Sequence, residues 1–75
     1  MGKYDNFNLA TLLKNLVEYG ITINTLTERC NEIEQKHKHY EKREDWILLS
    51  TRLVSARYQF NEIYEEIFRR CEKND

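Results

Sequence analysis

Proline is absent from this 75-residue chain, and glycine occurs only at positions 2 and 20. A sheet of short β-strands needs many tight turns, which proline and glycine form most readily. The longest uncharged runs, residues 6–13 and 19–27, are too short and too polar to cross a membrane. These absences favour an all-α protein that does not enter a membrane.

Cysteine is scarce as well, with Cys30 and Cys71 the only two in the chain. No basic start leads into an apolar stretch, as it would in a secretory signal peptide, so we expect a cytoplasmic protein with free thiols. Asparagine, lysine, isoleucine and tyrosine are frequent while alanine is rare, a bias that AT-rich codons produce. We therefore expect the source to be a bacterium or a phage-infected host.

Charge of one sign does not dominate, because the formal net charge is −1 although 33% of the residues are charged. Nucleic-acid-binding proteins usually carry an excess of lysine and arginine, so we do not expect the chain as a whole to bind polyanions. Hydrophobic residues make up 40% of the chain, which is enough for a folded state. We predict one small helical domain spanning residues 1–75.

Apolar residues recur alternately three and four positions apart in two long series, which together we call the seam. The first series consists of Leu9, Leu12, Leu16, Tyr19, Ile23, Leu26, Cys30, Ile33, His37 and Tyr40. The second consists of Trp46, Leu49, Leu53, Ala56, Phe60, Ile63 and Ile67. A repeat that averages 3.5 residues is typical of helices that pack along one another, as in a coiled coil.

The seam changes phase within five consecutive charged residues, 41–45. A phase change in a charged stretch is typical of a connection between two helices. We therefore predict a helix over about residues 7–40, a turn at 41–45 and a helix over 46–72. Asn6 or Asn8 can cap the first helix and Asp45 the second, and the polar residues before the first cap are expected to be frayed.

Folding the chain back at Arg43 tests this interpretation. Residues equidistant from Arg43 then pair in layers, and every layer joins one member of each series, from Tyr40 with Trp46 at the turn to Tyr19 with Ile67. Each layer also matches the two kinds of seam position in the way that antiparallel packing requires. The sequence therefore predicts an antiparallel helical hairpin.

Gly20 leaves one alternative open. Glycine followed by an apolar residue can end a helix, and Thr25 with Glu28 could start the next one. The seam nevertheless keeps its phase across Gly20. The first segment is therefore expected to form either a continuous or kinked helix, or two helices split near residues 20–24, which would give three helices in total.

A second set of apolar residues lies off the seam and towards the ends of the chain: Leu13, Val17, Ile21, Tyr64 and Phe68. Two helices alone form little core, and an apolar surface of this kind usually marks an interface. We expect the hairpin to dimerise into a four-helix bundle, unless a third helix folds back over this surface. We also expect a protein-interaction function, as an inhibitor or regulator that occludes a partner protein, in the manner of phage or mobile-element inhibitors of host enzymes or defence systems.

The opposing hypothesis is nucleic-acid binding through the predicted turn, where four cations cluster: Lys36, Lys38, Lys42 and Arg43. Acidic residues at 41, 44 and 45 offset this charge, which makes nucleic acid the weaker hypothesis. His37 and His39 are two residues apart and would point to different sides of a helix, so they do not predict a metal site. We find no pattern of catalytic or cofactor-binding residues and do not expect an enzyme.

Overall fold

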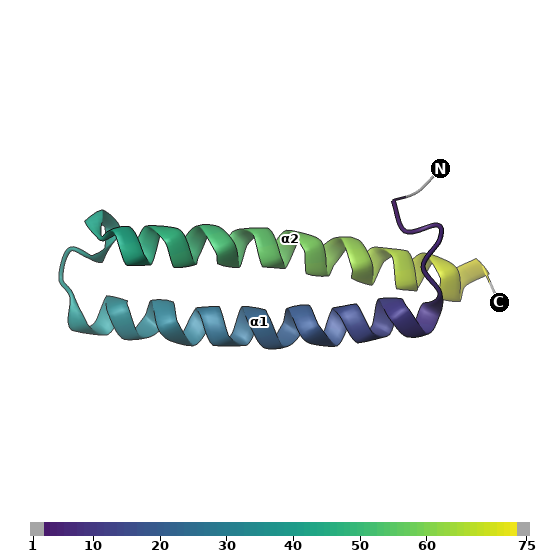
Figure 1. The fold of residues 1–75 in the computed structure, drawn as a ribbon, viewed down its shortest axis with the longest axis horizontal. Coiled ribbons are helices and arrows are strands. Elements are labelled where there is room, and N and C mark those ends of the chain that lie inside the picture. Colours follow the sequence, from purple (N-terminus) through teal and green to yellow (C-terminus); the bar gives the residue numbers. More distant parts are fainter. Residues whose placement is uncertain (1–2, 74–75) are drawn as a thin grey trace.

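Two long helices lie side by side and antiparallel along almost the whole molecule (Figure 1). The computed structural model describes residues 3–73, in which α1 spans Leu9–Lys36 and α2 spans Glu44–Lys73. A short 3₁₀ turn, η1, occupies Tyr40–Lys42 between them. The rod measures 51 × 20 × 17 Å. The predicted all-α antiparallel hairpin is confirmed. We call the end at which α1 begins and α2 ends the open end, and the other the turn end.

Helix α1 begins with a side-chain cap. The Asn8 Oδ1 atom accepts a hydrogen bond of 2.7 Å from the Thr11 backbone N–H, which has no partner inside the helix. Of the two asparagines that the sequence offered as caps, Asn8 therefore holds the position. Just before it, the Phe7 N–H donates to the Tyr4 carbonyl at 3.0 Å, so the chain turns as it enters the helix.

Loss of this cap should be measurable. We expect Asn8→Ala to lower the free energy of unfolding by about 0.5–2 kcal/mol, because the Thr11 N–H loses its acceptor. Asn6→Ala is the matched control and should change the free energy little, since Asn6 caps no helix. Urea unfolding followed by circular dichroism measures both values. Equal effects of the two substitutions would contradict the assignment of the cap.

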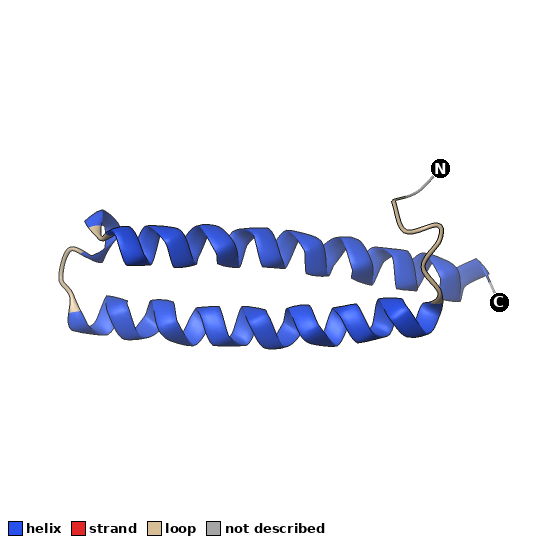
Figure 2. Ribbon diagram, in the orientation of Figure 1, coloured by secondary structure: helices blue, strands red, loops and turns tan. Residues whose placement is uncertain are grey.

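Helix α1 continues through Gly20 without a break (Figure 2), so the alternative with three helices is wrong. No glycine among residues 3–73 adopts a positive φ, the conformation that would end a helix there. A Cβ atom built on Gly20 would lie 3.7 Å from the Phe60 ring, an ordinary contact distance. Tertiary packing of the seam therefore overrides the weak helix propensity around Gly20.

The connection differs from the predicted turn at 41–45. Helix α1 ends at Lys36, and His37 is extended, with its N–H donating to the Ile33 carbonyl at 3.0 Å. At the other side, α2 begins at Glu44, so Asp45 lies in the first turn of α2 and not at the predicted capping position before it. The Asp45 Oδ1 atom still accepts a hydrogen bond of 2.8 Å from the Trp46 N–H. The connection is therefore longer than predicted and begins earlier in the chain.

The core follows the predicted seam. The buried hydrophobic residues are all seam residues: Leu12, Leu26, Cys30, Leu53, Ala56 and Ile63. Of the remaining seam residues only Leu9, at the first turn of α1, is exposed; the others are half-buried. The Tyr40 and Trp46 rings pack with their centroids 5.0 Å apart, as the register predicts for the layer next to the turn. The core is thus one stripe of contacts between two helices.

Candidate functional site

The five apolar residues predicted as an interface are all exposed in the open half of the rod. We call them the open-end surface: Leu13 (45% exposed), Val17 (61%), Ile21 (62%), Tyr64 (54%) and Phe68 (55%). The Tyr64 and Phe68 rings lie on successive turns of α2, with centroids 6.5 Å apart and planes 15° apart. Large exposed apolar and aromatic side chains are the groups that carry most of the energy at protein interfaces.

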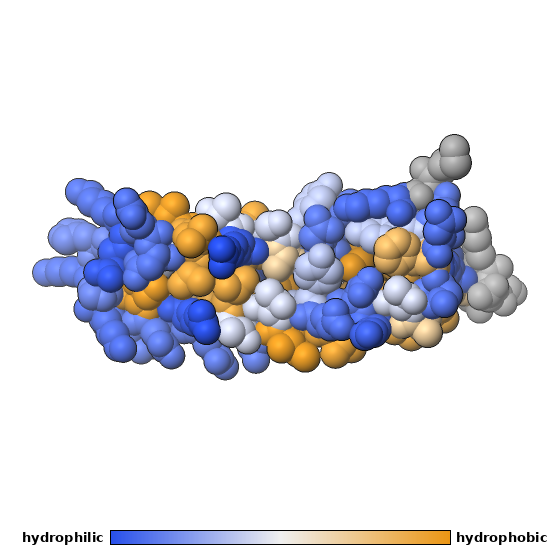
Figure 3. Space-filling view, viewed as in Figure 1, coloured by the Kyte–Doolittle hydropathy of each residue, from blue (hydrophilic) through white to orange (hydrophobic). Residues whose placement is uncertain are grey.

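Further apolar side chains that the sequence reasoning did not single out are exposed on α2: Ile47, Leu48, Val54 and Tyr58. They do not share one stripe of three- and four-residue spacing, which explains why the pattern search passed over them. Figure 3 shows that the turn end is hydrophilic, whereas apolar surface occupies the middle of the rod and the edge of α1 in its N-terminal half. The apolar surface therefore extends beyond the open end.

An arginine joins the N-terminal segment to α2. The Arg70 guanidinium donates to the Phe7 carbonyl at 2.6 Å and to the Tyr4 carbonyl at 2.7 Å. Its Nε atom donates to Glu66 Oε2 at 2.7 Å, and Arg69 donates to the other Glu66 oxygen. Lys3 and Tyr4, which fall in the segment expected to be frayed, therefore contact α2, while residues 1 and 2 lie outside the described residues. We call this arrangement the arginine clasp.

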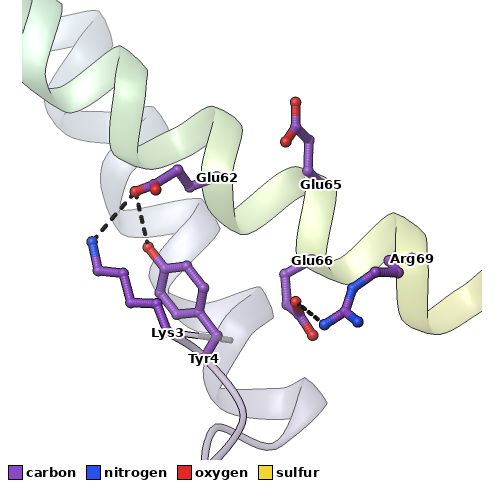
Figure 4. Close-up of a pocket in the computed structure, with 6 residues that line it drawn as sticks. All are labelled: Lys3, Tyr4, Glu62, Glu65, Glu66 and Arg69. Atoms are coloured by element: carbon purple, nitrogen blue, oxygen red, sulfur yellow. Dashed lines mark hydrogen bonds and ion pairs between the residues drawn. The ribbon is translucent and has the colours of Figure 1, made fainter. Parts of the chain in front are cut away.

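A shallow pocket of about 280 Å³ lies beside the clasp (Figure 4) and is lined by Lys3, Tyr4, Glu62, Glu65, Glu66 and Arg69. The Tyr4 hydroxyl lies 3.5 Å from a Glu62 carboxylate oxygen, and the Lys3 ammonium lies 3.4 Å from the same oxygen. These contacts pair Lys3 with Glu62 and hold residues 3 and 4 against α2.

The clasp predicts a pH dependence of stability. Hydrogen bonds from Arg69 and Arg70 lower the pKa of Glu66, so folding favours its ionised form. A carboxylate whose pKa is lowered by folding adds stability above its unfolded pKa of about 4.3, and loses it as the pH falls through the folded value. We expect the urea midpoint of Glu66→Gln to fall less between pH 7 and pH 3 than that of the native chain.

Glu65→Gln is the control for this experiment, because Glu65 is exposed and bonds to neither arginine. Its midpoint should follow that of the native chain. Some acid sensitivity should persist in Glu66→Gln, since Arg43 also lowers the pKa of Asp45. Parallel curves for Glu66→Gln and the native chain would show that the clasp does not hold Glu66 in its ionised form.

The basic residues of the alternative site lie around the connection at the turn end. Lys36, Lys38, Lys42 and Arg43 are all exposed. Arg43 is committed to Asp45 through two hydrogen bonds, Nε to Oδ1 at 3.1 Å and Nη2 to Oδ2 at 3.2 Å. Lys36, Lys38 and Lys42 form no ion pair with any residue that the structure describes, and three lysines are a small cluster for phosphate binding.

The two cysteines lie in different environments. Cys30 is buried in the seam, and burial raises the pKa of its thiol, whereas Cys71 is exposed near the end of α2. A buried thiol with a raised pKa is a poor nucleophile and a poor metal ligand. Across residues 3–73 no three histidine, cysteine or acidic side chains gather in a way that could hold a metal ion.

The fold defines an α-helical hairpin with apolar side chains exposed at its open end and along α2. No described helix is long and apolar enough to cross a membrane. Comparison with family models, curated proteins and solved structures finds no match to this chain.

Proposed function

We propose that the protein is a helical protein-interaction module that self-associates into a four-helix bundle and acts in the cytoplasm as an inhibitor or regulator by occluding a partner protein. The observation that carries the proposal is the open-end surface, whose five large apolar side chains are each 45–62% exposed. Large exposed apolar side chains that gather in one half of a two-helix rod are typical of a binding surface. Small inhibitors encoded by phages or mobile elements belong to this class.

A rigid hairpin suits occlusion for a physical reason. Its side chains are held on helices that need not order upon binding, so little conformational entropy is lost when the surface docks. Aromatic side chains such as Tyr64 and Phe68 can then anchor either a second copy of the chain or a groove of another protein, in the manner of other amphipathic helices. Blocking a site in this way requires no catalytic group on the inhibitor.

Self-association is the first test. Light scattering coupled to size exclusion, at micromolar concentration, should return about twice the chain mass of 9.2 kDa. The two helices alone bury little apolar surface, so a second copy would complete the core. A monomeric mass together with an intact helical circular dichroism spectrum would overturn the proposed dimer.

Charge reversal at the turn end separates partner binding from nucleic-acid binding. We expect the triple change Lys38→Glu, Lys42→Glu and Arg43→Glu to leave the affinity for a protein partner within a few fold at physiological salt. Charges at the rim of an interface act mainly on the rate of association. Affinity for nucleic acid would instead collapse in this variant and fall steeply with salt in the native chain. Activity that is lost through charge reversal alone would place the site at the turn end.

A further inference from the structure

One side of the rod is almost free of charge along its length. We call it the neutral face. It consists of the positions one and four residues after each of these seam residues: Leu9, Leu16, Ile23 and Cys30 on α1, and Trp46, Leu53, Phe60 and Ile67 on α2. Such positions flank the seam on the same side of both antiparallel helices. On α1 these positions are uncharged from residue 10 to residue 31, and they include Leu13, Val17 and Gly20. On α2, from residue 47 to residue 71, only Arg57 is charged, and Tyr64 and Phe68 belong to the face.

The N-terminal segment covers the opposite side of the hairpin. Lys3 and Tyr4 reach Gln59 and Glu62, and the arginine clasp fixes the segment there. All these partners on α2 lie on the seam or on its other, charged side. The chain therefore closes one side of its open end with its own residues and leaves the neutral face uncovered.

The exposed area of the hairpin matches what a second copy would cover. A compact folded chain of this mass exposes about 4,900 Å², whereas the hairpin exposes 6018 Å². The excess of about 1,100 Å² exceeds the roughly 800 Å² that each partner buries in a standard interface. A face as long and wide as the rod, 51 by 20 Å, is also large enough to supply that area.

We propose that a second copy of this chain packs its neutral face against the neutral face of the first, with both turn ends at the same end of the resulting bundle. The inference rests on the proposed self-association and adds the contact face and the relative orientation. A twofold axis parallel to the rod relates the two copies. Each α1 then lies along the α2 of its partner, and every contact occurs twice.

In this orientation the large apolar residues of α1 find apolar partners. On α1 the neutral face is apolar only in the open half, at Leu13 and Val17, and its turn half carries Thr27, Asn31 and Glu34. With the turn ends together, Leu13 and Val17 meet the aromatic half of the partner's α2. With the turn ends apart, each α1 meets the other α1, so Leu13 and Val17 would lie against polar residues and a charge. In that arrangement Ile47 and Val54, on the turn half of α2, would instead meet the aromatic half of the other α2.

Gly20 supplies an independent observation. A glycine within a helix is destabilising relative to alanine. Nothing within the hairpin requires it, because its φ is not positive and an added Cβ would meet only Phe60, at 3.7 Å. On the neutral face, however, a residue without a side chain leaves room for a large side chain of a partner helix. The aromatic residues at the same end of the partner's α2 provide one.

The orientation can be measured with spin labels at the turn. In a Cys30→Ala, Cys71→Ser background, a single cysteine at Glu41 places one label on each turn. Neighbouring helices in a bundle lie about 10 Å apart. With the turn ends together, the distance between the two labels, tethers included, should therefore be within about 25 Å. The opposite orientation would separate the labels by about the 51 Å length of the rod. Double electron–electron resonance distinguishes the two values.

Each outcome decides a different statement. A short distance in a species of dimeric mass supports the inference. A long distance in such a species overturns the orientation and leaves the proposed self-association standing. A monomeric mass for the unlabelled native chain overturns both.

Gly20→Leu tests the contact face without relying on labels. We expect it to raise the dissociation constant of the dimer at least about tenfold while the helical signal remains, because the added side chain separates the two copies. Thr22→Leu is the control, since Thr22 is exposed on the opposite, charged side of the seam. An unchanged dissociation constant for Gly20→Leu, or equal weakening by both substitutions, would overturn the neutral face as the contact.

Discussion

Ile63→Ala is expected to lower the free energy of unfolding by roughly 2–5 kcal/mol, which is most of the stability of a domain this small. Ile63 is 1% exposed and lies on the seam in the open half of α2. Truncation removes apolar burial and leaves a cavity that two straight helices cannot close by small shifts. Because the core is a single stripe, few other contacts are available to compensate.

The neighbouring residue provides a matched control. Tyr64→Ala removes a larger side chain that is 54% exposed, and it should cost the monomeric fold much less than Ile63→Ala. Urea midpoints at a series of protein concentrations separate loss of the fold from loss of association, since only the latter varies with concentration. A larger cost for Tyr64→Ala at limiting dilution would mean that the seam is shifted by one residue.

The second large effect is expected from charges on the open-end surface. The double change Val17→Glu and Phe68→Glu should abolish dimerisation or partner binding, with the dissociation constant raised at least about a hundredfold, because unpaired carboxylates would have to be buried. Both side chains are more than half exposed in the hairpin, so the helices themselves should remain folded. Light scattering and circular dichroism on the same samples measure the two properties.

Leu48→Glu with Tyr58→Glu is the control for this experiment. These residues are exposed to a similar degree, 53% and 63%, but neither belongs to the open-end surface or to the neutral face. The control adds the same charge and removes comparable apolar surface, so it tests whether position matters. Retained binding in the first double variant and its loss in the control would place the contact on the outer side of α2.

The seam was predictable because its signal is repeated many times along the chain. A single substitution such as His37 in an apolar series does not disturb a period that is sampled at seventeen positions, and the phase change before Trp46 marks the turn independently. The continuity of α1 through Gly20 could be favoured but not decided. Local propensity and the long-range phase pointed in opposite directions there, and packing along α2 decided the outcome.

The arginine clasp could not be predicted from the same reasoning. It depends on hydrogen bonds from Arg70 to the Tyr4 and Phe7 carbonyl oxygens. Every residue has a backbone carbonyl, so the pattern of residue types does not show which carbonyl an arginine will bind. Position 70 continues the spacing of the seam, so an arginine there indicates only that the apolar series has ended. The residues of the open-end surface were predictable because their spacing is helical. Their binding partner was not, because its identity depends on the surface of another molecule.

The arginine clasp also couples the segment before α1 to the last turns of α2. Arg70 is one turn from the end of α2, yet it holds the loop that precedes α1. Fraying of that last turn therefore withdraws the guanidinium from Tyr4 and Phe7 at the same moment. The segment before α1 and the last turn of α2 then form one cooperative unit, and the amide hydrogens of both should exchange with solvent through a shared opening event.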